Sequence, residues 1–233
     1  MPSQNVSLAR PYPWCYMRAL IALALLWNPL ASEAIELYCR NDLFTSQAID
    51  IKQAKVSTTE NGRLHFRGDG EGCPDSAQCI QKAYLVAGDK LIVSKSANGW
   101  TCGLFFGKKR EFVGWFPTRN LEISPVKPAY RLGDWAGIWA VGYGEIRIEP
   151  KGRDLEVSGE TLGHCRETPY GAMCNEGGFG GKAAPAGDLL TISGDSCTVQ
   201  MRLVSNYLIV TDNKNCGGMN VSFDNVYRRS GKL

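Results

Sequence analysis

The stretch Leu189–Thr211 decides the fold, and it reads LLTISGDSCTVQMRLVSNYLIVT. It contains three short runs rich in β-branched and apolar residues: Leu189–Ser193, Thr198–Val204 and Tyr207–Thr211. Brief turns separate these runs, and the second turn falls at Ser205–Asn206, two residue types that favour turns. Short strands that follow one another through tight turns pair as an antiparallel meander. The stretch therefore predicts a β-sheet built from sequence neighbours.

The same pattern continues outward through the C-terminal half. Four further runs are predicted strands: Gly137–Val141, Glu145–Glu149, Asp154–Ser158 and Asn220–Tyr227. Seven strands joined by brief turns favour an up-and-down sheet that closes into a small antiparallel barrel, because closure removes exposed strand edges. The stretch Leu162–Asp188 interrupts the pattern. It is rich in glycine, and we expect it to form an irregular loop.

The N-terminal half has a similar pattern, and none of its apolar runs has a helical period. Its predicted strands, separated by Gly-Asp, Asn-Gly and Gly-Lys-Lys turn signals, are Ala83–Val86, Lys90–Val93, Trp100–Phe106 and Phe112–Phe116. Pro125 and Pro128 lie in a segment that cannot carry a regular ladder. The predicted fold class is therefore all-β, with domains at 35–123 and 135–233 joined by a linker at 124–134.

Composition limits the classes of function. The 233 residues are 44% hydrophobic and 21% charged, which is enough apolar material for a packed core and excludes disorder as the dominant state. The formal net charge is +3, too small for the concentrated basic surface that binds nucleic acid through its phosphates. We therefore expect no nucleic-acid partner.

The N-terminus has the layout of a secretory signal peptide. Arg10 and Arg18 precede the apolar run Ala19–Trp27, and the small residues Ser32 and Ala34 occupy positions −3 and −1 of a cleavage site. A membrane anchor is the alternative, but the run is about half of the roughly 20 residues that a spanning helix needs. We expect residues 1–34 to be removed, giving a periplasmic or secreted protein that is not inserted in a membrane.

Eight cysteines remain after cleavage, four in each half of the chain: Cys39, Cys73, Cys79, Cys102, Cys165, Cys174, Cys197 and Cys216. An even number in each half is typical of two separately bridged domains in an oxidising compartment. A zinc site is the alternative reading, but it would require closely paired C-x2-C spacings that are missing here. We therefore predict disulfides and no metal.

The predicted strands select among the possible pairings. The turn at Ser205–Asn206 places Cys197 opposite the residues just after Asp212, close enough for a bridge to Cys216. The short spacing of Cys73 and Cys79 favours a local bridge. The complete set that we predict is Cys39–Cys102, with Cys39 on an opening strand, Cys73–Cys79, Cys165–Cys174 and Cys197–Cys216.

Three segments of the N-terminal half resemble bacterial SH3-like domains. They are Tyr84–Val93 (YLVAGDKLIV), Asn98–Cys102 (NGWTC) and Val113–Pro117 (VGWFP). In that family a Gly-Asp turn and two Gly-Trp strands recur in this order. The resemblance implies an SH3-like barrel for this half and peptidoglycan as a possible ligand.

Aromatic side chains give this half a candidate binding groove. Flat aromatic faces bind glycans or extended peptides with little loss of entropy. The candidate ligand-binding residues are Tyr84, Trp100, Phe106 and Trp115. The alternative is that these rings are packing residues of a small barrel, and for Trp115 that alternative is favoured.

The C-terminal half resembles the calycin barrels, the superfamily of lipocalins and avidins. Trp135-Ala-Gly-Ile-Trp139 has the Gly-x-Trp opening of that superfamily, and Tyr227-Arg-Arg229 closes the last predicted strand. The resemblance implies that Arg228 or Arg229 lies over the Trp139 ring. Such a cation–π contact contributes about 0.5 to 2 kcal/mol, depending on desolvation.

Motifs for catalysis are weak. His164 and Cys165 are adjacent, but neighbouring residues on a strand point to opposite faces, and Cys174 is an obvious disulfide partner for Cys165. No Gly-x-Ser-x-Gly occurs, and His65 and His164 are the only histidines. Glycoside cleavage by a pair of carboxylates remains an alternative, because the distance between two carboxylates cannot be read from the sequence. We expect no catalytic residues and no cofactor.

Two functions from different classes follow. The first is an exported, non-enzymatic binding module of the bacterial envelope that recognises peptidoglycan or an envelope protein. The second is a periplasmic inhibitor of a lysozyme-like enzyme, because calycin-like disulfide-bridged barrels include such inhibitors. In that case the loop at 162–188 inserts into the cleft of the enzyme.

Overall fold

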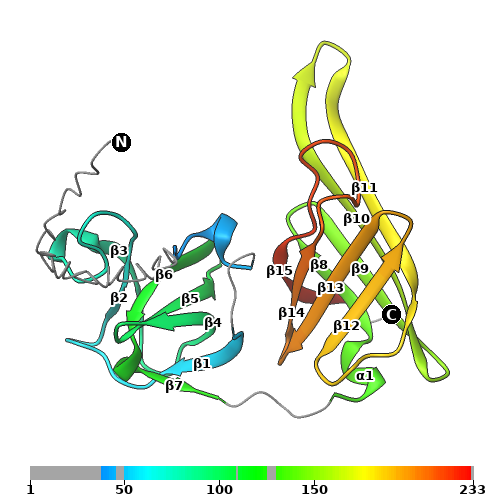
Figure 1. Ribbon diagram of the computed structural model, residues 1–233. Coiled ribbons are helices and arrows are strands. Elements are labelled where there is room, and N and C mark those ends of the chain that lie inside the picture. The colour runs from blue at the N-terminus through cyan, green and yellow to red at the C-terminus, as the bar shows by residue number, and fades with distance from the viewer. Residues whose placement is uncertain (1–37, 46–49, 109, 125–129, 232–233) are drawn as a thin grey trace, which may run out of the picture. The chain divides into compact units, whose positions relative to one another are not determined.

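The computed structural model describes residues 38–45, 50–108, 110–124 and 130–231 (Figure 1). These residues belong to one compact unit, Leu37–Leu233. The predicted signal peptide at 1–34 lies outside the described residues. Among those that are described, no helix is long and apolar enough to span a membrane.

The first half of the chain forms a seven-stranded antiparallel sheet in the order β3-β2-β6-β5-β4-β1-β7. Its strands are β1 (Lys52–Val56), β2 (Leu64–Arg67), β3 (Ile80–Leu85), β4 (Lys90–Ala97), β5 (Trp100–Phe106), β6 (Glu111–Pro117) and β7 (Leu121–Ile123). Three single 3-10 turns accompany them: η1 (Asn41–Leu43), η2 (Ala77–Cys79) and η3 (Thr118–Asn120). Phe66 and Phe116 meet edge-to-face in its core, with ring centroids 4.7 Å apart.

The four strands predicted in this half are present as β3 to β6, although Val86 follows the end of β3. The sequence did not predict β1, β2 and β7, which are three to five residues long and each contain a charged residue. The expectation that Cys39 lies on a strand is wrong, because Cys39 precedes the η1 turn. Its sulfur still reaches Cys102 on β5.

The second half forms an eight-stranded antiparallel sheet in the order β11-β10-β9-β8-β15-β14-β13-β12. A helical turn, α1 (Leu132–Trp135), precedes it, and its strands are β8 (Gly137–Val141), β9 (Gly144–Lys151), β10 (Asp154–Thr168), β11 (Gly171–Ala183), β12 (Leu189–Gly194), β13 (Cys197–Val204), β14 (Tyr207–Asp212) and β15 (Asn225–Gly231). Every strand pairs with its sequence neighbour except across one break, between β11 and β12. The first and last strands, β8 and β15, also pair. The sheet is the predicted meander, but its hydrogen-bonded ring stays open at that break.

Two predictions about this half are wrong. The stretch 162–188 is not an irregular loop, because β10 and β11 form a long hairpin that pairs from Leu155 with Ala183 to Thr168 with Gly171 (Figure 1). The sheet therefore has eight strands, not seven. The ladder depends on backbone groups, which glycine supplies as well as any residue. The last strand also begins later than predicted, at Asn225, and Asn220 has a positive φ of 61°.

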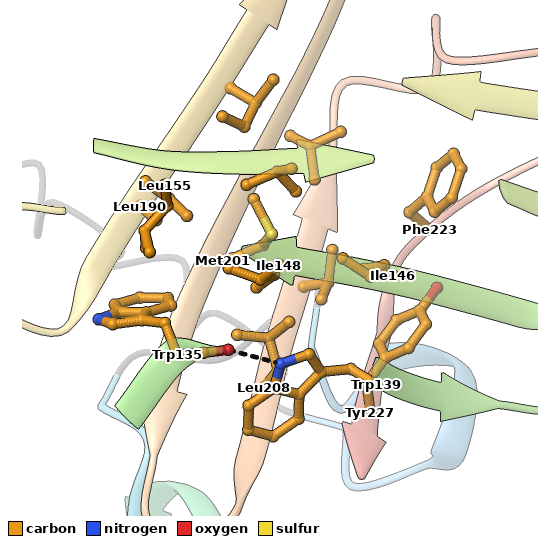
Figure 2. Close-up of a cluster of buried hydrophobic side chains, with 14 of the residues drawn as sticks. Trp135, Trp139, Ile146, Ile148, Leu155, Leu190, Met201, Leu208, Phe223 and Tyr227 are labelled. Carbon is orange, nitrogen blue, oxygen red and sulfur yellow. Dashed lines mark hydrogen bonds between the residues drawn. The ribbon is translucent and has the colours of Figure 1, made fainter. Parts of the chain in front are cut away.

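Trp135, Trp139 and Tyr227 are fully buried in the core of the second sheet (Figure 2). The Trp139 Nε1–H donates a hydrogen bond of 2.9 Å to the Trp135 carbonyl oxygen, shown by the dashed line in Figure 2. The Arg229 guanidinium lies 4.3 Å from the centroid of the Trp139 ring, as the resemblance implied. Arg229 also donates hydrogen bonds to the carbonyl oxygens of Asp134 and Ala136. This arginine therefore anchors α1 to the last strand.

Four disulfides bridge the chain, and their pairing is the one predicted: Cys39–Cys102, Cys73–Cys79, Cys165–Cys174 and Cys197–Cys216. Two bridges lie in each half, and none crosses the predicted linker at 124–134. Each half therefore has its own sheet and its own pair of bridges.

Candidate functional site

The predicted aromatic groove is only partly accessible. Trp115 on β6 is 4% exposed, and its Nε1–H donates a 2.7 Å hydrogen bond to Asp69 Oδ1. The half-buried ring of Phe106 stacks on Tyr207 at 5.1 Å between centroids. The guanidinium of Arg228 lies 4.7 Å from the same Phe106 ring. Neither Trp115 nor Phe106 therefore offers a free aromatic face.

Tyr84 and Trp100 are the more accessible members of the predicted set. Tyr84 on β3 is 44% exposed, and the guanidinium of Arg63 lies 4.6 Å from its ring centroid. Trp100 is half-buried and donates a 2.9 Å hydrogen bond through Nε1 to Asp75 Oδ1. Arg67 lies 5.1 Å from the Trp100 centroid. Both rings thus have an arginine over one face.

A second surface, which the sequence did not indicate, lies at one end of the second sheet. We define the hairpin end as the turn 142–143, the part of the β10–β11 hairpin beyond Glu160 and Gly178, and the loop 213–222. Nine large apolar side chains are exposed in the described chain, and five belong to the hairpin end: Tyr143, Leu162, Tyr170, Met173 and Met219. Tyr170, at the tip of the hairpin, is 99% exposed. Exposed apolar groups gathered at one end mark an interaction surface more often than isolated ones do.

The loop 213–222, which we name the clamp loop, fastens the base of the hairpin. The Gly178 N–H donates to the Cys216 carbonyl oxygen at 3.0 Å, and the Gly218 N–H donates to the Glu176 carbonyl oxygen at 3.1 Å. The amide of Asn175 also donates to the Met219 carbonyl oxygen at 2.5 Å. The clamp loop therefore continues the sheet for a short distance beside β11 (Figure 1).

Glycine is required where the clamp loop crosses the hairpin. A Cβ atom on Gly163 would lie 2.5 Å from the Asn220 carbonyl oxygen, and one on Gly177 would lie 2.4 Å from a methyl group of Val221. Real Cβ atoms do not make contacts this short, so a side chain at either position would push the clamp loop away. Part of the glycine enrichment of this stretch is thus explained by close packing.

The base of the clamp loop is fixed by two aspartates. Asp212 Oδ2 accepts a hydrogen bond from the Phe223 N–H at 2.6 Å, and Asp212 Oδ1 accepts one from the Lys214 N–H at 2.9 Å. Asp224 Oδ1 accepts the Asp212 N–H at 2.6 Å, and Lys214 also pairs with Asp224. The Cys197–Cys216 bridge adds a covalent tie to β13. The loop therefore has a defined conformation.

A cleft of about 990 Å³ opens between the hairpin, the clamp loop and the β12–β13 turn. Its walls include three carboxylates, from Glu160, Glu176 and Asp195, and no Lys, Arg or His. Within the described residues none of these carboxylates forms an ion pair. Apolar groups complete the lining, among them Tyr143, Leu162, Phe179 and Ile192. The cleft is acidic with apolar patches, which suits a cationic ligand.

The two cysteines of the β10–β11 hairpin are joined in a disulfide. Cys165 is bonded to Cys174, so its sulfur is not available as a thiolate nucleophile. In the described part of the chain, no three His, Cys, Asp or Glu side chains are grouped closely enough to hold a metal ion. What the surface offers is backbone edges and apolar side chains, next to a cleft lined by carboxylates.

One sequence signal for this surface was available. Cys165 and Cys174 stand at equal distances from the pair Pro169–Tyr170, as expected for two strands that meet at a turn. The carboxylates of the cleft had no comparable signal, because Glu160, Glu176 and Asp195 come together only in the folded sheet.

Comparison of the chain with protein-family models, curated proteins and solved structures finds no match. The functional argument therefore rests on the geometry described above.

Proposed function

We propose that this chain is an exported, non-enzymatic binding module of the bacterial envelope, and that the ligand of its hairpin end is an envelope protein. The single observation that carries the proposal is the concentration of exposed apolar residues on a projecting hairpin of fixed shape. We propose further that the first sheet is SH3-like and the second calycin-like. Four disulfides fit folding in an oxidising compartment, such as the periplasm or the exterior.

Rigidity is the physical reason for preferring a binding role. The Cys165–Cys174 bridge joins the two strands of the hairpin, and the clamp loop fixes its base. A surface that is already ordered loses little conformational entropy when a partner binds. Tyrosine and methionine, which are exposed here at Tyr143, Tyr170, Met173 and Met219, are enriched in protein interfaces.

Peptidoglycan is the weaker of the two ligands expected from the sequence. A glycan site needs open aromatic faces, and Trp115 and Phe106 are occupied by packing contacts. Tyr84 and Trp100 remain as partly accessible rings in the first sheet. The protein partner is favoured because the hairpin end has a larger set of exposed apolar groups than these two rings provide.

Inhibition of a lysozyme-like enzyme is the second candidate. The observation that favours it is the tip of the hairpin, which projects beyond the other strands of its sheet and carries the fully exposed Tyr170 (Figure 1). A narrow hairpin of this kind is a suitable element to enter the cleft of an enzyme. In this form of the proposal the segment at 162–188 acts as a strand pair and not as a loop.

The experiment compares two surfaces on the same protein. A photocrosslinker at position 170 is expected to capture an envelope protein, whereas the same group at position 84 captures none. The captured protein is then purified, and its Kd is measured with the wild type and with the double variant Tyr170→Ser, Met173→Ser. We expect the double variant to weaken binding about tenfold or more, as the loss of interface anchors does.

Two further assays separate the alternatives. Inhibition of lysozyme that is lost in the double variant would identify the enzyme-inhibitor form of the function. The wild type and the double variant could both sediment with peptidoglycan sacculi while Tyr84→Ala does not. That result would contradict the proposal and place the ligand site in the first sheet.

A further inference from the structure

The break in the second sheet leaves two strand edges beside each other. In the described chain β11 and β12 are the ends of the hydrogen-bonded order, and no ladder joins them. They are nevertheless neighbours, because the Cβ position of Gly181 lies 3.0 Å from a methyl group of Ile192. We name this break the seam. At the side of the hairpin end, the seam opens into the acidic cleft, whose walls include Gly178, Gly180 and Gly194.

The direction of the backbone groups at the seam follows from two hydrogen bonds. The Gly178 N–H and the Glu176 C=O both bond to the clamp loop, so they point away from β10. In an antiparallel ladder alternate residues present both their N–H and their C=O to the same side. Gly180 is the next such residue, and both of its backbone groups face the seam. In the described chain no hydrogen bond is made there.

Side chains do not cover this edge. Gly178 and Gly180 are both exposed and have no side chain, so that the β11 backbone is open to a ligand. The clamp loop already pairs with β11 at Glu176 and Gly178, and then leaves the edge. The unused part of the edge therefore continues an interaction that the protein itself begins.

We propose that an extended, basic segment of the partner protein adds to the free edge of β11 inside the cleft, at the Gly178 C=O and at the N–H and C=O of Gly180. This inference rests on the proposed function and names the kind of segment that the site takes. Alternating backbone donors and acceptors recognise another main chain, as in other cases of strand addition. The carboxylates of Glu160, Glu176 and Asp195 give the segment its charge preference, because no Lys, Arg or His of the described chain lines the cleft.

The test uses two variants at one position. Gly180→Pro removes the edge N–H, and proline is tolerated on the outer side of an edge strand. Gly180→Ala keeps the N–H, and its Cβ atom would meet the Val157 carbonyl oxygen at 3.4 Å, an ordinary contact. The probe is a short peptide in which lysine and threonine alternate, and its counterpart alternates glutamate and threonine.

We expect the lysine peptide to bind wild type and Gly180→Ala with similar Kd, and to bind Gly180→Pro about tenfold more weakly. The glutamate peptide is expected to bind none of them. In the wild type, the lysine peptide should slow hydrogen exchange at the Gly180 amide, a measurement that does not depend on whether the proline variant folds. Unchanged exchange at Gly180, or equal binding to the alanine and proline variants, would overturn strand addition.

The crosslinked partner separates this inference from the function on which it rests. If the partner is lost with the double variant Tyr170→Ser, Met173→Ser but binds Gly180→Pro and Gly180→Ala equally, the protein-binding function stands and strand addition is wrong. If neither the double variant nor Gly180→Pro weakens the binding of the partner, the hairpin end is not the binding surface.

Discussion

Asp69 shows how a single carboxylate organises the start of the described chain. Its two oxygens accept hydrogen bonds from the Cys39 N–H at 2.9 Å, the Arg40 Nε at 3.0 Å and the Trp115 Nε1 at 2.7 Å. The same carboxylate opposes the effect of burial on Lys95, whose pKa is lowered mainly by burial. The indole of Trp115 is therefore buried, and its one polar group is bonded to Asp69.

The role of Trp115 as a packing residue leads to the first prediction. Trp115→Ala removes a buried indole and leaves Asp69 without one donor, so we expect unfolding to become easier by about 3–5 kcal/mol, the usual cost of a buried aromatic. Tyr84→Ala removes a ring that is 44% exposed and should cost about 1 kcal/mol or less. Urea denaturation, monitored by far-UV circular dichroism and not by tryptophan fluorescence, measures the change in the free energy of unfolding for both variants. Equal effects of the two substitutions would contradict the assignment of Trp115 to the core.

At the scale of elements, the sequence predicted the disulfide of the β10–β11 hairpin correctly but not its strands. The pairing of Cys165 with Cys174 was predicted because these two cysteines remained to tie the glycine-rich stretch, yet the strands around them were not predicted, because glycine supplies no side-chain periodicity to read. The β12–β14 meander was predicted well, since its apolar runs alternate with turn residues. The end of the clamp loop was predicted as part of a strand, because Asn220–Asp224 has strand-like residue types. In the structure Asn220 and Val221 instead pack on Gly163 and Gly177.

The disulfides differ in the length of chain they close, which gives the second prediction. Cys39–Cys102 spans 63 residues, whereas Cys73–Cys79 spans 6. In the chain-entropy account these loops are worth about 4 and about 2 kcal/mol. We expect the pair Cys39→Ser, Cys102→Ser to lower the free energy of unfolding more than Cys73→Ser, Cys79→Ser. A reversed order in guanidinium denaturation would show that contacts of the small loop, and not chain entropy, dominate.

A cross-strand ion pair provides the third prediction. Glu156 on β10 faces Lys182 on β11, and the hydrogen bond from Lys182, with a smaller effect of Lys151, lowers the pKa of Glu156. A carboxyl group with a lowered pKa stabilises the fold above its unfolded pKa, and the contribution is lost as the pH falls through its native pKa. Lys182→Met should therefore raise the pKa of Glu156.

Titration of the Glu156 side chain by NMR measures this shift directly. Lys90→Met, a substitution in the first sheet, is the control and should leave the pKa of Glu156 unchanged. The same pKa in the Lys182→Met variant and in the wild type would show that the ion pair is not populated in solution.

For the whole molecule, the sequence indicated two β-rich halves and their bridges, and each half does form its own sheet, one within 52–123 and one within 137–231. The sequence could not locate the proposed binding surface. The hairpin end and the cleft beside it combine Tyr143, Glu176, Asp195 and Met219, which are far apart in the chain and meet only through the meander and the clamp loop. Local patterns report on neighbours along the chain, and a surface assembled from distant turns leaves no local pattern.

The proposed export leads to the fourth prediction, at this largest scale. The compact unit begins at Leu37, and Cys39 is the first bridged cysteine of the described chain, so cleavage after Ala34 leaves the four described bridges in place. We expect N-terminal sequencing of periplasmic material to begin near Ile35, and a chain that starts there to unfold at the same denaturant concentration as the exported protein. Full-length protein in the membrane fraction would contradict the predicted cleavage.

The bridged hairpin also determines how the protein responds to proteolysis. A protease that cuts at Tyr170 severs the backbone between Cys165 and Cys174, but the disulfide keeps both fragments in one covalent molecule. Of the four bridges in the described chain, this one alone spans the tip, so the fragments separate on a denaturing gel only after reduction. The β10–β11 ladder continues for many residues below the cut. A nicked molecule can therefore persist in a protease-rich compartment with its sheet intact. The cut is detected only after the disulfide has been reduced.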